Sequence, residues 1–564
     1  MRIEKVLIEN YRNIDGLEVQ LQRDISFIVG ENNIGKSNLI MALSHIFSGK
    51  SFAKSDFKNE NSPIKCTFTL FLNDDDIGVF DDLIDPESEN SITIVATQTT
   101  PDDYIVYIHL ETEEIIHPNV IKKINLVCYD SLRNPRNEID FNKAKGAGAF
   151  LNKVLHEYIT SNVDEPLLDS TKVDSMILEL NDTFSKLNAF SRFDIIASVE
   201  DNQESFLSRI VSLKDSNNVS ISETGYGVQF SILIVLSLLE KIEDYAKKKK
   251  EYEKVFSTVL VFDEPEIHLH PFLQKTILSE LMDIATGNDA NFNSIIKKYF
   301  GIESIEAQII VATHSPNMIM DDYKKIVRLY KDSTKKIHAA SGFDIAFSQQ
   351  DEKTLLRQFE YVKEAVYARV CVIVEGDSEY ACMKQFGKSL GISFDSNGIS
   401  VIKAGGAESV IPIMNLLERI GIYTVGIIDR DKKDEKQLPD KENLFYTTTK
   451  CFDSEIVTTL FSSNHLEILN DIIEKWDSQK LTRPFTKNKI NKIIKEFNIS
   501  YPEVNQDYSI ETATDLDLKQ IIYLTWFAVN KGIIVGKIIG ETVPKEHIPC
   551  CYIDAINKAK EYSE

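Results

Sequence analysis

The sequence has few cysteines, no long apolar run and no excess of positive charge. Its seven cysteines include no CxxC pair, so they indicate a reducing compartment and exclude a disulfide framework or a zinc module. The longest apolar runs, such as SILIVLSLL at 231–239, are too short to cross a bilayer. The N-terminus is charged from its second residue, so we expect no signal peptide, no membrane partner and a cytoplasmic location.

The charge balance limits how the protein can meet nucleic acid. Lys and Arg number 63 and Asp and Glu number 87, which gives a net charge of −24. A chain of this charge is not drawn as a whole to nucleic acid or to an anionic membrane. Any nucleic-acid site must therefore be a local basic groove or work through bound metal. The 564 residues, 43% of them hydrophobic, are enough for roughly two to four globular domains.

The first part of the chain begins with two strands, a loop and a helix. RIEKVLIENY at 2–11 alternates polar and apolar residues as a half-buried strand does, and DISFIVG at 24–30 is a short apolar strand. Helical periodicity begins at Asn38. Further strands are predicted at 63–72, 92–110, 258–265 and 307–316, and mainly helical segments at 147–215 and 228–246.

A new pattern begins after about residue 365. The segments RVCVIVEGDSEY, GISVIKAGG and TVGIIDRDKK each read as a strand that ends in a polar loop. Strands that alternate with helices at this spacing predict a second, largely parallel α/β unit. We place the boundary between the two parts near 350–368.

A phosphate-binding motif follows the second strand. Gly30, Gly35, Lys36 and Ser37 fit GxxxxGK[ST], with a strand before the motif and a helix after it. Such a loop turns its backbone N–H groups and a helix N-terminus toward phosphates. Lys36 is expected to reach the β- and γ-phosphates and Ser37 to hold Mg²⁺. Residues Asn33 and Asn38 complete the expected nucleotide-binding set.

Two further segments supply the groups that such a site needs. VLVFDE is an apolar strand that ends in Asp263 and Glu264, which beside a phosphate-binding loop would bind Mg²⁺ through water and polarise the attacking water. His314 closes the strand QIIVAT and can contact a γ-phosphate. A Gly-rich segment that opens a helix contributes Gly225, Gly227 and Gln229.

These features together resemble the ABC/SMC-type ATPases over roughly residues 1–345. The resemblance implies ATP with Mg²⁺, and a homodimer or higher homo-oligomer in which one subunit's signature loop completes the other's phosphate-binding loop. Gly225, Gly227 and Gln229 correspond to that signature loop, and His314 to the switch histidine. The loop reads GYGVQ where transporters have LSGGQ, which argues against a transporter subunit.

Acidic residues follow two strands of the second part. Glu375 comes directly after one strand with Glu379 one helical turn later, and Asp429 and Asp431 stand two residues apart at the end of another. Acids at i and i+2 of an extended segment share a face. Clustered carboxylates repel one another unless a divalent cation neutralises them. The pattern therefore predicts a metal site.

The E-G-x-x-E strand followed by D-x-D resembles the Toprim fold, and Toprim behind an SMC-like ATPase resembles the OLD-family nucleases (overcoming lysogenization defect). That group includes the Gabija nuclease subunit and retron-associated OLD effectors. The resemblance makes Glu375, Glu379, Asp429 and Asp431 metal ligands and catalytic residues. It adds Glu455 as a later metal-binding acid and Lys537 as the catalytic lysine, with Lys531 as a near alternative.

The resemblance also implies a chemistry and partners. Two Mg²⁺ ions, or Mn²⁺ or Ca²⁺, would activate water and stabilise the leaving 3′-oxygen of a phosphodiester, while the lysine offsets charge on the phosphorane. DNA is the implied substrate, and a helicase-like protein or a retron RNA or DNA complex is an implied partner. A topoisomerase would need further DNA-gate modules and a primase a zinc module, for which this sequence has no room or no cysteine spacing.

We therefore predict an α/β protein with an ABC/SMC-type P-loop ATPase domain, interrupted by a helical insertion, and a Toprim α/β domain. The predicted parts are an N-terminal ATPase lobe at 1–146, a helical insertion and possible dimerisation element at 147–215, a C-terminal ATPase lobe at 216–360, and a Toprim nuclease domain at 366–564. A basic stretch inside the last part has two open interpretations, phosphate binding or a solvated surface. It consists of Lys480, Arg483, Lys487, Lys489, Lys492 and Lys495.

The expected function is an ATP-regulated, divalent-metal-dependent DNA endonuclease, nicking or cutting both strands, in anti-phage defence. Two alternatives stay open. One is an SMC-like ATPase whose Toprim domain binds DNA without cutting it, and the other is a nucleotide sensor with slow turnover. Nicking of supercoiled plasmid with Mg²⁺ or Mn²⁺ would distinguish a nuclease from the first alternative. ATP hydrolysis rates with and without DNA would distinguish the second alternative, the nucleotide sensor, from a motor.

Overall fold

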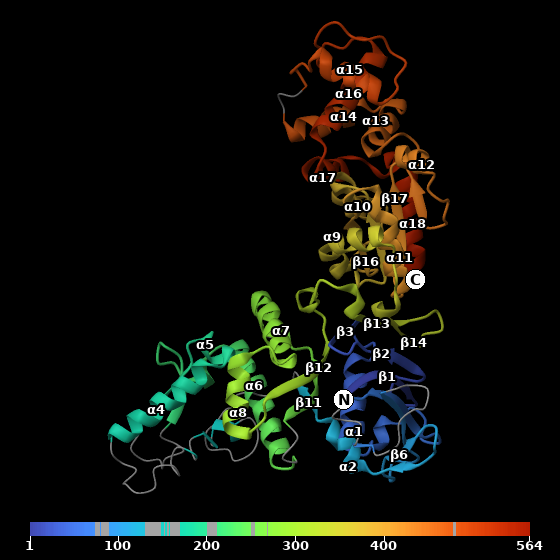
Figure 1. The fold of residues 1–564 in the computed structure, drawn as a ribbon. Coiled ribbons are helices and arrows are strands. Elements are labelled where there is room, and N and C mark those ends of the chain that lie inside the picture. The colour runs from blue at the N-terminus through green and yellow to red at the C-terminus, as the bar shows by residue number, and fades with distance from the viewer. Residues whose placement is uncertain are drawn as a thin grey trace. The chain divides into compact units, whose positions relative to one another are not determined.

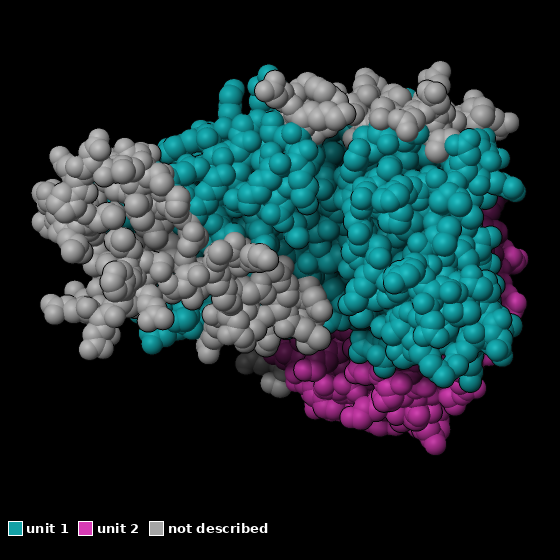
Figure 2. All heavy atoms as spheres, turned by 90° about the horizontal axis from the view of Figure 1, so that it is seen from below, with its two compact units in different colours: residues 1–320, 325–343 teal, residues 321–324, 344–564 magenta. Residues whose placement is uncertain are grey.

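The computed structural model divides the chain into two compact units (Figure 2). The first consists of residues 1–320 and 325–343, and the second of residues 321–324 and 344–564. The residues that the structure describes are 1–73, 79–80, 90–129, 148–151, 153–154, 157, 170–199, 211–249, 254–267, 269–477 and 481–564. In these parts of the chain no helix is long and apolar enough to cross a membrane.

The first unit begins with an antiparallel sheet in the order β2-β1-β4-β5-β6-β7. Its strands are β1 (Arg2–Glu9), β2 (Leu17–Gln20), β4 (Ile64–Phe71), β5 (Ser91–Gln98), β6 (Val106–His109) and β7 (Ile115–Ile116). Alternate residues of β4 are buried, which is the pattern of a sheet with one face in the core. The strands predicted at 63–72 and 92–110 lie in this sheet.

A second sheet of the same unit holds the phosphate-binding loop. Its order is β14-β13-β3-β12-β11-β8, and every pair is parallel except β13 with β14. The strands are β3 (Ile25–Gly30), β8 (Leu126–Tyr129), β11 (Val255–Asp263), β12 (Ser304–Ala312), β13 (Ile326–Lys331) and β14 (Ile337–Ser341). All six residues of β3 are buried, as in a parallel strand covered on both faces. Because β3, β11 and β12 are parallel neighbours, their carboxyl ends meet at one edge.

The helices of the first unit follow the sequence colours of Figure 1 from blue to green. They are α1 (Lys36–Ser48), α2 (Pro118–Ile121), α4 (Ser170–Ser185), α5 (Asn188–Ser191), α6 (Tyr226–Ala246), α7 (Pro271–Ala285) and α8 (Ala290–Phe300). The described part of 147–215 contains α4 and α5, and also an antiparallel strand pair of β9 (Ile196–Val199) and β10 (Val211–Lys214). The helical prediction for this range did not include that pair, since four-residue strands leave little periodicity.

The second unit contains a parallel sheet in the order β16-β15-β17-β18. The strands are β15 (Val370–Val374), β16 (Ile399–Lys403), β17 (Tyr423–Ile428) and β18 (Leu444–Tyr446). The helices are α9 (Gln349–Ala365), α10 (Asp377–Ser389), α11 (Ala407–Arg419), α12 (Arg430–Lys436), α13 (Phe452–Ser462), α14 (Leu466–Trp476), α15 (Lys487–Glu496), α16 (Leu516–Asn530), α17 (Ile533–Thr542) and α18 (Cys550–Ser563). Both units confirm the predicted α/β fold class.

The change from one unit to the next lies at 321–344, whereas the sequence placed a boundary at 350–368. The difference is due to α9, which packs against α11 and β16 of the second unit. The four-part division of the chain stays a prediction.

Candidate functional site

The loop between β3 and α1 has a backbone that demands glycine. Gly30 has φ +144° and Gly35 has φ +115°, a region in which an L side chain is strained. A Cβ atom at Gly30 would also lie 2.4 Å from the carbonyl oxygen of Leu329 in β13. Asn33 has φ +58°, which asparagine tolerates better than most residues. The loop therefore needs these residue types for its shape as well as for a ligand.

Lys36 is the first residue of α1 and is almost fully buried, with 4% of its surface exposed. Its Nζ donates hydrogen bonds to the carbonyl oxygens of Gly30 (3.1 Å) and Glu31 (3.0 Å). Burial lowers the pKa of Lys36 to about 8, although the charges of Glu264 and Asp263 act in the opposite direction. The ammonium group thus lies over the loop carbonyls, close to two carboxylates.

The predicted magnesium-binding pair is joined by a hydrogen bond. Ser37 Oγ donates to Asp263 Oδ1 at 3.1 Å, although 226 positions separate the two residues. Asp263 ends β11, and the backbone N–H of Glu264 donates to the carbonyl oxygen of Ala312 at the end of β12 (2.8 Å). A hydroxyl beside a carboxylate is a donor set that Mg²⁺ accepts.

His314 and Glu264 face each other at this sheet edge. His314 Nε2 lies 3.5 Å from Glu264 Oε1. Burial and the nearby charge of Lys36 lower the pKa of His314, although the charge of Glu264 acts in the opposite direction. The backbone N–H of His314 donates to Glu266 Oε1, and burial raises the pKa of that carboxyl. Glu266 therefore fixes the backbone that presents His314.

The Gly-rich segment lies at the N-terminus of α6. Gly225 precedes the helix and is exposed, whereas Gly227 is buried. Gln229 is 1% exposed, and its Nε2 donates to the carbonyl oxygens of Ser222 (3.3 Å) and Thr224 (2.8 Å). Gln229 thus holds the loop backbone from inside. Within the described residues, no hydrogen bond or ion pair joins this loop to Lys36 or Ser37.

The sequence reasoning did not single out Arg12 and Asn13, which support the phosphate-binding loop. Arg12 donates from Nη1 to Asn38 Oδ1 and from Nε to Asp56 Oδ1, both at 2.8 Å. Asn38 Nδ2 donates to Asn13 Oδ1 (2.7 Å), and Asn13 Nδ2 donates to the carbonyl oxygen of Asn33 (3.5 Å). Asn33 and Asn38 are therefore held by hydrogen bonds with the side chains of Arg12 and Asn13, in the segment IENYRNI at 8–14.

The second candidate site lies at the carboxyl ends of β15 and β17. The two strands are parallel neighbours, so the residues that follow them meet at one edge. The backbone N–H of Asp429 donates to Glu375 Oε2 at 3.3 Å. Glu379 lies in the first turn of α10 and is 7% exposed. The structure thus brings Glu375, Glu379 and Asp429 together.

Burial and mutual repulsion act on these acids in the same direction. Burial raises the pKa of Asp429 to about 9, and the charges of Glu379 and Glu375 add to that shift. Burial also raises the pKa of Glu379 to about 7. The pKa of Glu375 is raised first by burial and then by the charge of Asp431. The four predicted acids therefore form one electrostatic cluster.

A fifth acid, Asp453, belongs to this cluster and was missed. It lies in the first turn of α13, burial raises its pKa to about 6, and its Oδ1 is buried without a hydrogen-bond partner. The charge of Asp453 raises the pKa of Glu379. Glu455, predicted as the later metal ligand, accepts hydrogen bonds from Thr448 Oγ1 and Thr449 N, both at 2.7 Å. Both oxygens of Glu455 thus hold the loop before α13.

The structure favours the alternative lysine. The charge of Lys531, between α16 and α17, lowers the pKa of both Glu379 and Asp453. The Lys537 side chain is 65% exposed and lies 3.9 Å from Glu541 on its own helix. Lys531 is therefore a cation that acts on the acid cluster, as is Lys432, whose charge lowers the pKa of Glu375.

Close helix packing explains the glycines of GKIIGE. A Cβ atom at Gly536 would lie 2.2 Å from the carbonyl oxygen of Ser378, and one at Gly540 would lie 2.9 Å from Cβ of Gln385. The two glycines, four residues apart, let α17 pack directly on α10. The backbone N–H of Gly532 also donates to Ser378 Oγ (3.0 Å). These contacts hold the turn that contains Lys531 at the first turn of α10, which carries Glu379.

The acid cluster fits a divalent cation by its chemistry. Carboxylate oxygens are the preferred ligands of Mg²⁺ and Ca²⁺, and Asp453 supplies a buried oxygen that has no other partner. In the described parts of the chain, no three His, Cys, Asp or Glu side chains already surround one metal position. Carboxylates without a cation repel one another. A divalent cation is thus supported by the chemistry of these carboxylates and not by ligands already arranged around one position.

The raised pKa values predict how stability depends on pH in EDTA. The pKa of Asp429 is about 9 in the folded protein and about 4 in an unfolded chain, so the folded state keeps a proton that the unfolded state loses. The free energy of unfolding therefore falls as pH rises from about 4 to about 9. Asp429→Asn is expected to weaken this fall, measured by urea unfolding at pH 6 and pH 8.5. An equal fall in both proteins would contradict the buried acid.

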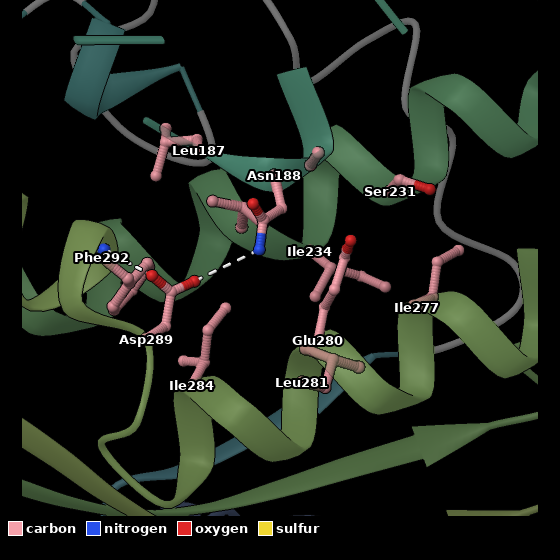
Figure 3. A pocket seen from close by; sticks show the side chains of 12 residues that line it. Leu187, Asn188, Ser231, Ile234, Ile277, Glu280, Leu281, Ile284, Asp289 and Phe292 are labelled. Carbon is pink, nitrogen blue, oxygen red and sulfur yellow. Dashed lines mark hydrogen bonds between the residues drawn. The ribbon is translucent and has the colours of Figure 1, made fainter. Parts of the chain in front are cut away.

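A small cavity in the first unit lies apart from both sets of residues. Figure 3 shows it between α5, α6, α7 and the start of α8, with mainly aliphatic side chains around it. Its volume is about 20 Å³, room for roughly one water molecule. Asp289 accepts a hydrogen bond from Phe292 N (2.9 Å) and caps α8 there. We assign no ligand to this cavity.

Two protein-family models match the chain. Residues 25–321, more than half of the sequence, match the family described as "AAA domain, putative AbiEii toxin, Type IV TA system". Residues 366–431 match "Overcoming lysogenization defect protein-like, TOPRIM domain". The second match contains Glu375, Glu379, Asp429 and Asp431.

Individual relatives agree with these models. The Old nuclease of Escherichia phage P2 is 22% identical over 544 residues, which cover 85% of each chain. Endonuclease GajA of Bacillus cereus (strain HuB5-5) is 22% identical over 365 residues, 56% of this chain and 48% of its own. The solved C-terminal region of the Burkholderia pseudomallei OLD protein matches with a TM-score of 0.24 and 17% identity, over 35% of this chain and all of that one. The chain therefore belongs to this AAA-domain family and carries an OLD-like Toprim domain in its second part.

Proposed function

We propose that the protein is an ATP-regulated, divalent-metal-dependent DNA endonuclease of the cytoplasm that takes part in anti-phage defence. The observation that carries the proposal is the acid cluster at the ends of β15 and β17, with Lys531 as a cation that acts on Glu379. The names of two relatives, Old nuclease and Endonuclease GajA, support the nuclease activity.

The cluster residues would hold the metal ions and the scissile phosphate. Glu375, Glu379, Asp429 and Asp431 are the proposed ligands, with Asp453 as a further one. Divalent ions bound there supply an activated water and stabilise the leaving 3′-oxygen. Lys531 offsets negative charge that develops on the phosphate, because its ammonium group already acts on Glu379 and Asp453.

The first unit would bind and hydrolyse ATP. Lys36 would contact the β- and γ-phosphates, and Ser37 with Asp263, which are hydrogen-bonded to each other, would hold Mg²⁺. Glu264 would polarise the attacking water, and His314 beside it would contact the γ-phosphate.

The Gly-rich loop supports a homodimer through the ATPase units. Gly225 is exposed, a Cβ atom there would meet nothing within 4 Å, and the helix N-terminus behind it is suited to an anion. We infer that this loop contacts the nucleotide of a second copy. Gln229 keeps the loop in shape from inside.

A plasmid-cleavage assay tests the proposed function. We expect nicking or linearisation of supercoiled plasmid with Mg²⁺ or Mn²⁺, none in EDTA, and a rate that changes when ATP is added. A protein that binds the plasmid and leaves it intact with every metal and nucleotide would be a DNA-binding ATPase or a nucleotide sensor.

Two alanine variants distinguish the roles of Lys531 and Lys537 in cleavage. Lys531→Ala is expected to lower the cleavage rate by about 100-fold or more, the scale of losing one charge-stabilising group. Lys537→Ala is expected to stay within about twofold of the wild type, since its ammonium group lies beside Glu541 of its own helix. Initial nicking rates at saturating Mn²⁺ measure both. The opposite ranking would return the role to Lys537.

A further inference from the structure

A group of exposed cations lies on α15 of the second unit and on the segment just before it. We call Arg483, Lys487, Lys489 and Lys492 the cation row; all four are exposed. The last three belong to α15, whose buried side chains are Ile490, Ile493 and Ile494. With about 100° between successive residues of a helix, Lys489 and Lys492 lie about 60° apart on one side of α15, whereas Lys487 lies about 140° from Lys492 on another side. The isoleucine side packs toward α16, which is beside α15 in Figure 1.

The backbone under the cation row is held by several hydrogen bonds. Asn491 donates from Nδ2 to the carbonyl oxygen of Val504 (2.9 Å) and accepts from the N–H of Val504 (2.7 Å). Phe485 and Tyr508 exchange two backbone hydrogen bonds, at 2.8 and 3.2 Å. The N–H of Lys487 donates to Asp507 Oδ1 at 2.8 Å. The cations therefore extend from a fixed surface, and a ligand need not order the backbone.

The cation row is not neutralised by the protein. Across the described residues, none of its four side chains forms an ion pair. Lysines nearby do: Lys495 lies 2.6 Å from Glu503, and Lys475 lies 2.8 Å from Asp471. Glu496, four residues after Lys492, forms no ion pair with it within those same residues. In a chain with a net charge of −24, four exposed cations within ten residues, none of them in an ion pair among the described residues, make this segment locally positive.

We propose that the cation row binds the phosphate backbone of duplex DNA away from the cleavage site. The inference rests on the proposed nuclease function and names the surface that holds its substrate. Lys489 and Lys492 are separated by a rise of about 4.5 Å along the helix, and B-DNA carries one charge per ~1.7 Å of its axis, so adjacent side chains can meet different phosphates. Contacts of this kind position DNA without reading its sequence.

The salt dependence of DNA binding tests the cation row. Binding of the full-length protein to a fluorescent duplex of about 30 base pairs is measured in EDTA, which prevents cleavage, from 50 to 200 mM KCl. Each phosphate contact contributes about 0.9 to the slope of log affinity against log salt. The variant R483Q/K487Q/K489Q/K492Q is expected to lose at least about 1.8 from that slope, about 0.9 for each of Lys489 and Lys492. Lys495→Gln, on the same helix but already paired, is the matched control and should keep the wild-type slope.

The outcomes separate this inference from the nuclease proposal. An unchanged slope in the fourfold variant would show that the cation row does not bind DNA, even if the protein cuts plasmid. A slope reduced as expected supports it even if no cleavage is found. Should the fourfold variant melt early, Lys489→Gln and Lys492→Gln are tested singly, and each must lower the slope by about 0.9. Tighter binding of duplex RNA than of duplex DNA, with the same loss, would overturn DNA as the ligand.

Discussion

Replacing Asp429 and Asp431 together by alanine is expected to abolish DNA cleavage and leave ATP hydrolysis intact. Asp429 lies against Glu375, and the charge of Asp431 acts on both, so the double change removes the centre of the acid cluster. Without a bound metal the phosphodiester has neither an activated water nor a stabilised leaving group. Plasmid nicking and phosphate release are measured on one preparation, because Lys36 and Asp263 belong to the other compact unit.

Two controls accompany the double variant. Asp434→Ala removes an exposed acid of the same helix that lies 3.4 Å from Arg430, and it should cut as the wild type does. In thermal melts the wild type should gain stability from Mg²⁺, and the double variant should not. Its melting temperature in EDTA should be no lower, because fewer like charges are buried together. Nicking at the wild-type rate by the double variant would place the nuclease site elsewhere.

The sequence allowed prediction of those site residues that directly end or follow a strand. Lys36 and Ser37 follow β3, Asp263 ends β11, and Asp429 follows β17. Parallel strands bring their carboxyl ends to one edge, so short motifs far apart in sequence meet without any further information. The hydrogen bond from Ser37 to Asp263 is an instance.

The residues that were missed act across the fold and not along a motif. Asp453 joins the acid cluster because α13 begins beside the end of β17, where Phe452 N donates to Asp429 Oδ1 at 3.0 Å. The segment CFDSE offers two acids, both buried, and the sequence has no means to tell which one acts on Glu379. Arg12 and Asn13 likewise act only through the side chain of Asn38 and the backbone of Asn33.

The resemblance to the family assigned Lys537, in GKIIGE at 536–541, as the catalytic lysine. Gly536 and Gly540 mark GKIIGE as a segment in which glycine is required, and Lys537 stands between them. The requirement comes from the close approach of α17 to α10, since a Cβ at Gly536 would overlap the backbone of Ser378. Lys531 precedes α17, in a turn whose geometry no local pattern predicts.

Replacing Lys36 by alanine is expected to weaken ATP binding by about 10- to 100-fold, the scale of one charged hydrogen bond at about 1.5–3 kcal/mol. The ammonium group lies over the loop carbonyls, so the β- and γ-phosphates lose their main side-chain partner. Calorimetric titration with ATP and Mg²⁺ measures the change. Lys54→Ala, at an exposed lysine paired with Glu60, is the matched control and should bind as the wild type does.

The stability of the Lys36→Ala protein decides how a loss of binding is interpreted. Burial lowers the pKa of Lys36 to about 8, which means that the folded protein holds the charged form at a cost. Removing that charge offsets the two hydrogen bonds that are lost, so the melting temperature without ATP should change by no more than a few degrees. Wild-type affinity for ATP in a folded Lys36→Ala protein would show that the nucleotide is held by other residues. Lost affinity in a protein that melts normally would assign Lys36 to the phosphates directly.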